Sequence, residues 1–96
     1  MVPEWFLSVS ANAEEVCADW LKVCAWLSQK TGHTRRAYKF EILSLLKFVR
    51  RPLKKITTEE LAAFLFTKEG KAKATKKRSK DAISSFFTYL VKTQYI

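Results

Sequence analysis

Most of the cationic side chains of this 96-residue chain lie in two short segments. Segment 31–55 carries eight Lys and Arg residues against one acid, Glu41, and segment 68–80 carries seven against one acid, Glu69. Segment 1–30 has the opposite balance, with two lysines against four carboxylates. A charge spread for solubility alone would not be bunched in this way. Positive charge concentrated beside helical patterns can form a footprint for a polyanion such as nucleic acid.

The other residues that could perform chemistry are few and badly placed for it. Cys17 and Cys24 are seven residues apart in a helical pattern, which puts them about 10 Å apart along one helix face. That separation is too long for a disulfide, so we predict two small buried hydrophobic residues in a reducing, cytoplasmic protein. His33 is the only histidine, and it is predicted to lie on the surface or at a helix start. Two cysteines and one histidine do not make a zinc site, so the sequence predicts no catalytic residue, metal or cofactor.

The aromatic residues are predicted to be mainly structural. Trp5, Trp20 and Trp26 could stack on bases, but packing in a core or an interface is favoured. Tyr38 and Tyr89 fall on apolar helix stripes, so we expect packing there with the hydroxyls at the rim. The acidic first helix, with Trp20 and Trp26, is predicted to be a protein-facing surface.

The periodicity of apolar residues predicts an all-α chain of four helices. Two Gly, two Pro and no clean alternation argue against strands. The segment 1–12 is predicted to be a flexible N-terminal arm, without a signal peptide because it lacks a basic leader. No apolar run approaches the roughly 20 residues of a membrane span. The expected helices run from about Ala13 to Gln29, from Gly32 to Arg50, from Thr58 to Lys68, and from within Lys73–Lys76 to Thr93.

Helical wheels at about 100° per residue place the cations on the outer flanks of two of these helices. Because both helices share one core, we expect their basic stripes to be neighbours and to form a single surface. Nucleic acid is the favoured ligand, with an acidic protein, a merely solvated face or an anionic membrane as alternatives. The stripe on the second helix holds Arg36, Lys39, Lys47 and Arg50. The stripe on the fourth holds Lys73, Lys76, Lys77, Lys80 and Ser84.

Three segments, in this order, resemble the N-terminal core-binding domain of tyrosine recombinases, the phage-type integrases. The first is Thr34-Arg35-Arg36-Ala37-Tyr38 with the apolar residues after it. The second is the run from Pro52 through Thr57 to Leu61. The third is Arg78 with Ala82-Ile83 and the run from Ser85 to Leu90. The resemblance covers about residues 31–96 and implies a compact four-helix, SAM-like domain that forms half of a clamp around a recombination site.

The resemblance also implies which residues contact DNA and which parts of the family's enzyme are missing. By position, the contacts are Arg36, Lys39, Lys47, Lys77, Arg78, Lys80 and Ser84. The family usually has an apolar residue where Lys80 stands, which leaves the register of the last helix open. The family's catalytic domain is expected to be absent from this chain, so no catalytic residue is carried over.

We therefore predict a DNA-binding domain of a site-specific recombinase, which is not itself an enzyme. Its expected partners are double-stranded DNA and other recombinase protomers, with no membrane and no small-molecule substrate. The alternative is a small basic helical adaptor, or a recombinase regulator, that binds an acidic protein.

Overall fold

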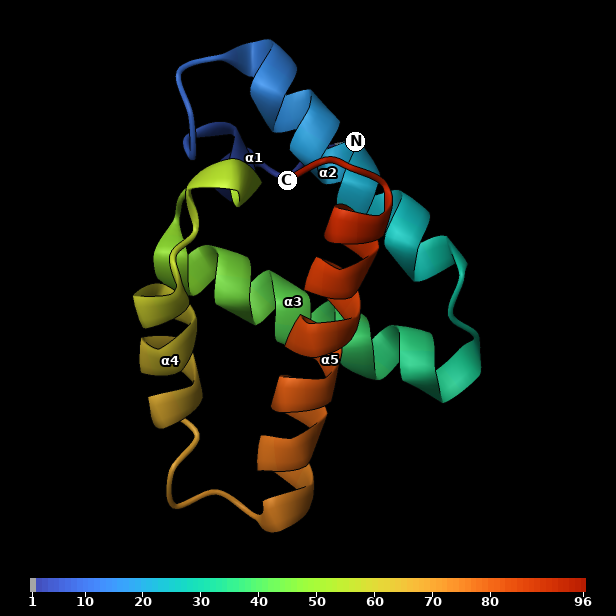
Figure 1. Cartoon of the computed structure of the whole chain (residues 1–96), viewed down its shortest axis with the longest axis vertical. Helices are drawn as coiled ribbons and strands as arrows, with labels where there is room; N and C mark the ends of the chain where they lie inside the picture. The colour runs from blue at the N-terminus through green and yellow to red at the C-terminus, as the bar shows by residue number, and fades with distance from the viewer. Residues whose placement is uncertain (1) are drawn as a thin grey trace.

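The computed structural model describes residues 2–96, and over these residues the chain is all-α, as predicted (Figure 1). The described part measures 38 × 28 × 25 Å along its principal axes. None of its helices is long and apolar enough to cross a membrane. The elements are α1 (Glu4–Leu7), α2 (Ala13–Ser28), α3 (Gly32–Val49), the 3-10 turn η1 (Leu53–Lys55), α4 (Thr58–Phe66) and α5 (Lys73–Lys92).

The four predicted helices are present, and local signals explain where they begin and end. The Asn12 side chain accepts a hydrogen bond from the Glu15 N–H at 3.2 Å, which caps the start of α2. At the start of α4, Thr57 and Glu60 exchange both hydrogen bonds of a full capping box. Helix α3 ends at Val49; the N–H of its C-cap residue, Arg50, donates to the Leu46 carbonyl at 2.9 Å, and the left-handed backbone of Arg50 (φ 50°) turns the chain out of the helix.

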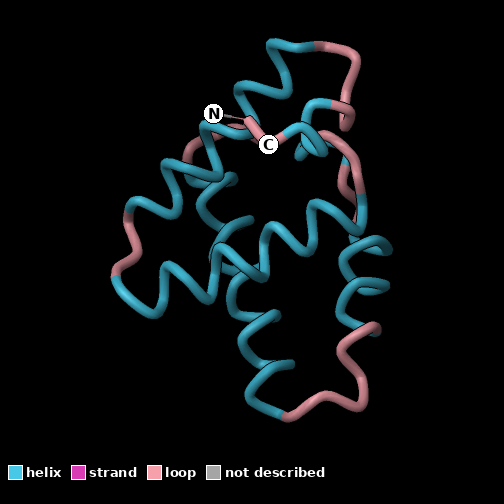
Figure 2. Tube along the Cα trace, turned by 180° about the vertical axis from the view of Figure 1, so that it is seen from behind, coloured by secondary structure: helices cyan, strands magenta, loops and turns pink. Residues whose placement is uncertain are grey.

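Helices α3 and α5 form the main packing contact of the fold. In Figure 1, α5 passes in front of α3, and from behind, in Figure 2, α3 passes in front of α5. Small side chains, Ser79 and Ala82, lie on the buried face of α5, and they allow two helix backbones to approach closely. The crossing therefore presses the inner faces of α3 and α5 together and turns their outer faces in opposite directions.

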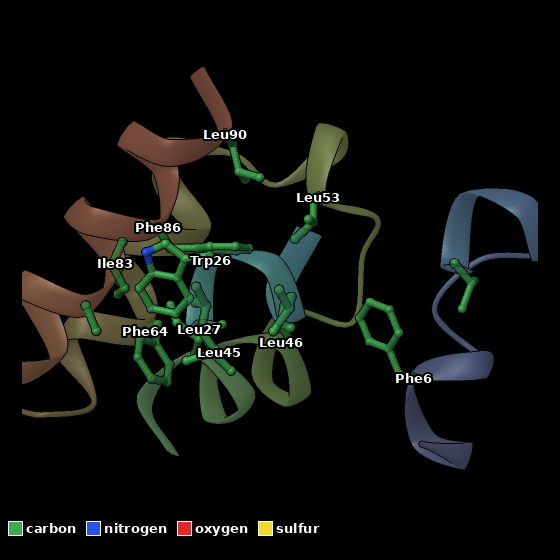
Figure 3. Packing of buried hydrophobic residues seen from close by; sticks show 14 residues of the cluster. Phe6, Trp26, Leu27, Leu45, Leu46, Leu53, Phe64, Ile83, Phe86 and Leu90 are labelled. Atoms are coloured by element: carbon green, nitrogen blue, oxygen red, sulfur yellow. The ribbon is translucent and has the colours of Figure 1, made fainter. Parts of the chain in front are cut away.

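The core gathers around Trp26 and Phe86 (Figure 3), both of them almost completely buried. Their rings lie 4.9 Å apart between centroids, and Tyr38 of α3 stacks on Trp26 at 5.7 Å. The Trp26 indole N–H donates to the Ser85 hydroxyl at 3.2 Å. This cluster joins α2, α3 and α5 and so fixes the helices that carry the cations.

The N-terminal segment differs from the prediction of a flexible arm. Residues 4–7 form the one-turn helix α1, and the Phe6 side chain is completely buried. Its ring packs 5.4 Å from the ring of Trp20 on α2. A single buried aromatic residue supplies enough contact area to hold a short segment on the bundle. One apolar residue does not make a repeating pattern, so the periodicity of the sequence could not predict this contact. The part of the prediction that concerns residue 1 lies outside the described residues.

Candidate nucleic-acid interface

Helix α5 presents a basic outer face that we call the α5 surface. A buried ladder of small and apolar residues, which includes Ser79, Ala82 and Phe86, faces the core. At about 100° per residue, the side chains between these positions must point outward. Except for half-buried Lys76, all members of the surface are exposed. The α5 surface consists of Lys73, Lys76, Lys77, Arg78, Lys80 and Ser84.

Two carboxylates neutralise only part of the charge at this surface. Lys76 pairs with Glu69 at 3.1 Å, and Lys77 pairs with Asp81, one turn later, at 3.4 Å. Lys77, Glu69 and Asp81 have exposed side chains and Lys76 has a partly exposed one, so each pair contributes little to stability. Residues 68–81 hold seven cations against these two acids. A strong positive charge therefore remains available for a ligand.

Arg36 of α3 and Arg78 of α5 meet in one open groove at the start of α3. His33, Thr34 and Phe40 also line this groove. Thr31, the N-cap residue of α3, makes no side-chain capping hydrogen bond, and the first turn of a helix leaves backbone N–H groups without intrahelical partners. Two guanidinium groups beside the positive end of a helix form a setting that favours an anion such as phosphate.

The remaining predicted contacts on α3, Lys39, Lys47 and Arg50, are all exposed. They lie on the outer side of α3, opposite the residues that pack on α5, such as Glu41 and Leu45. One member of the α3 stripe, Arg36, shares a groove with Arg78 of α5, and for Lys39, Lys47 and Arg50 the expectation of one continuous basic surface stays a prediction. We call the side of α3 that carries Lys39, Phe40, Leu43 and Lys47 the α3 outer face.

The α3 outer face also has a different chemical character. Phe40 is 65% exposed there, and Leu43 is half-buried between the two lysines. The Lys47 ammonium lies over the Trp5 ring, 5.2 Å from its centroid. Arg50 bends back and donates from Nε to the Lys47 carbonyl at 3.2 Å. This face therefore mixes cations with apolar side chains.

A buried hydrogen bond holds the crossing of α3 and α5. Ser79 of α5 donates to Glu41 of α3 at 2.6 Å, and both side chains are almost fully buried. Glu41 therefore takes no part in the surface charge, although the sequence shows it as the only acid within the first basic segment. Its partner is 38 residues away, so no local pattern could have revealed this role.

A second buried carboxylate ties the end of the chain to the bundle. Asp19 accepts a hydrogen bond from the Leu53 N–H at 3.0 Å and another from the Tyr95 hydroxyl. Burial raises the pKa of Asp19 above its ordinary value, although both hydrogen bonds act in the other direction. Burial and the neighbouring Asp19 carboxylate raise the pKa of Tyr95 as well. The arrangement joins α2, η1 and the C-terminal segment, so we assign it a structural role.

The two cysteines are placed differently from the prediction. Cys17 and Cys24 are both exposed free thiols, which corrects the prediction that they are buried, because the core face of α2 uses Val16, Val23 and Trp26 instead. Within residues 2–96, no group of three or more His, Cys, Asp and Glu side chains could hold a metal ion. Trp26 is buried, so it cannot belong to the predicted protein-facing surface.

Comparison with known proteins identifies no relative. No family model matches the chain, and neither a curated protein nor a solved structure is significantly similar to it. The resemblance to tyrosine recombinases therefore stays a prediction from the sequence.

Proposed function

We propose that this chain is a DNA-binding module, the N-terminal core-binding domain of a site-specific tyrosine recombinase, with α2 to α5 as the four helices of a SAM-like domain. In this proposal the duplex lies against the α5 surface, and the groove of Arg36 and Arg78 holds a phosphate at its edge. The observation that carries the proposal is the excess of seven cations over two carboxylates across residues 68–81.

The chemistry of the α5 surface favours DNA over an acidic protein. Protein interfaces bury an apolar centre inside a polar rim. Among the described residues, no large apolar side chain from residue 73 to residue 84 is exposed. A phosphate backbone needs no apolar centre, since its affinity comes from neutralisation and release of counterions. The exposed hydroxyls of Ser84 and Thr88 add hydrogen-bond donors of the kind that bind phosphate oxygens.

The size of the surface predicts weak binding that is sensitive to salt. From Lys73 to Ser84 the helix rises about 16 Å, which corresponds to roughly half a turn of B-form DNA. A single module of this size contributes perhaps 600–1,000 Å² of contact. We therefore expect the domain to contribute part of the affinity and the orientation on DNA, and the rest of a recombinase complex to supply the remaining DNA contacts.

An amide-shift titration with a short duplex of random sequence, at two salt concentrations, tests this proposal. We expect shifts on α5 and at the start of α3, and smaller shifts at higher salt. Charge reversal at Lys77→Glu with Lys80→Glu should abolish them. The matched control, Lys39→Glu with Lys47→Glu, changes net charge equally but on the α3 outer face. Equal losses in both variants, or shifts confined to the α3 outer face, would remove the α5 surface from the proposal.

Neutral variants make the test quantitative. Each phosphate contact contributes about 0.9 to the slope of log affinity against log salt. Lys77→Gln with Lys80→Gln should therefore lower that slope by about 1.8, measured by fluorescence anisotropy. The recombinase part of the proposal is tested separately by the reading frame that encodes this chain. A continuation that lacks a second domain with the family's nucleophilic tyrosine would leave a DNA-binding module of another kind.

A further inference from the structure

A groove lies between α2 and α3. We propose that this groove binds an acidic amphipathic helix of a partner protein, independently of the DNA proposed for the α5 surface. Its lining combines apolar side chains with cations at the rim. The residues that matter are Trp20, Cys24 and Leu27 of α2, and Arg35, Lys39 and Leu43 of α3.

The floor of the groove is apolar and continues onto neighbouring surface. Leu27 is buried there, while Trp20 and Leu43 are only half covered. Leu21, on the same helix as Trp20 and Cys24, is 68% exposed. Large side chains left open around a concave apolar floor mark interaction sites more often than free surface. Two helices that frame such a groove suit a third helix, which inserts residues at i, i+3, i+4 and i+7.

The positive charges at the rim of the groove favour a negatively charged partner. Arg35 and Lys39 line the groove, and Lys47 lies two turns further along α3, about 12 Å away. The three ion pairs found within residues 2–96 involve none of these side chains. Arg35 uses Nε for the Leu27 and Lys30 carbonyls, at 3.1 and 3.0 Å, which fixes the guanidinium at the rim and leaves its terminal nitrogens for a ligand. A helix with carboxylates beside its apolar stripe would satisfy both the floor and the rim.

Other anionic ligands fit this groove less well. A duplex would meet the cations with its phosphates but would gain nothing from the apolar floor between them. An anionic membrane would meet exposed Leu21 but would leave buried Leu27 and the rest of the groove floor uncovered. A helix of two to three turns can cover the floor and reach the cations at the same time.

A display library of helical peptides with randomised surface positions, selected on the purified domain, tests the proposal. Selected peptides should share a Leu, Ile or Phe stripe flanked by Asp and Glu. In a Cys17→Ser background, a bound peptide should slow maleimide labelling of Cys24. The Lys39→Glu and Leu43→Ala variants should each weaken binding about tenfold. Lys80→Glu is the matched control on the α5 surface and should leave peptide affinity unchanged.

Several results would overturn the proposal. Neutral or basic selected peptides would contradict the role of the rim, and failure to recover any helical binder would contradict the groove itself. An equal loss of affinity in Lys39→Glu and Lys80→Glu would mean that only net charge matters. Protection of Cys24 by a random duplex, or by vesicles of anionic lipid, in place of the peptide would assign the groove to one of those ligands.

Discussion

The buried hydrogen bond between Ser79 and Glu41 predicts a large cost for a small substitution. Ser79→Ala removes only the hydroxyl oxygen, but it leaves the Glu41 carboxylate without its 2.6 Å donor in a site that is almost closed to water. Hydrogen bonds to charged groups stabilise by roughly 1.5–3 kcal/mol, and an unsatisfied buried acceptor adds its desolvation cost. We expect Ser79→Ala to lower the free energy of unfolding by about 2–3 kcal/mol.

That loss is large for a domain of this size. At roughly 0.05–0.15 kcal/mol per residue, 96 residues give about 5–14 kcal/mol in total. The melting temperature should fall by roughly 8 °C or more. Urea unfolding followed by circular dichroism measures the change, and an unchanged slope with denaturant confirms that the same surface is exposed in both proteins.

A double-mutant cycle separates the hydrogen bond from a simple loss of packing. Glu41→Leu replaces the carboxylate with an apolar side chain of similar volume. Added to Ser79→Ala, it should restore part of the lost stability, because no buried acceptor is then left unpaired. If the double variant is less stable than Ser79→Ala alone, or if Ser79→Ala costs less than about 0.5 kcal/mol, the reasoning about this crossing is refuted.

Three further predictions concern packing and pH. Phe86→Ala should lower the free energy of unfolding by about 3–5 kcal/mol, because it leaves a cavity in the core. Phe40→Ala, at an exposed site, should change the urea midpoint little, and equal midpoints for the two variants would contradict the burial of Phe86. The raised pKa of Asp19 means that the folded protein holds this proton more tightly, so the contribution of Asp19 to stability falls as pH rises above 3.8. Asp19→Asn should accordingly gain stability relative to the parent over that window, and parallel pH profiles would contradict this. Hydrogen bonds from Thr57 and Arg51 lower the pKa of Glu60. Glu60→Gln should therefore destabilise the folded protein at neutral pH and have no effect in acid, where Glu60 is protonated. A destabilisation that persists in acid would argue against the ion pair with Arg51.

The helices could be predicted because their signals are local. The periodic apolar residues and the caps at Asn12 and Thr57 place α2 and α4 within a few residues of where the structure has them. The same reasoning gives α3 and α5, and it identifies the buried ladder through Ala82 and Phe86.

What could not be predicted depends on how the helices meet. A wheel fixes which side of α3 holds Arg36, but not where α5 crosses, so it could not show that Arg36 shares a groove with Arg78. The burial of Glu41 and Asp19 depends on partners 38 and 76 residues away, Ser79 and Tyr95. The α2–α3 groove was missed for the same reason, because its floor and its rim come from different helices.

The position of Phe6 has a practical consequence for anyone who shortens this chain. Residues before α2 look dispensable in the printed sequence. Removing them would remove the buried Phe6 ring from its contact with Trp20 and expose that part of the core to water. By analogy with other Phe truncations, the cost would be about 3–5 kcal/mol. A trimmed protein that precipitates, or that gives no shifts in the titration proposed above, would then report a damaged interior and not a missing contact. Deletion series should therefore begin from chains that keep residues 2–12.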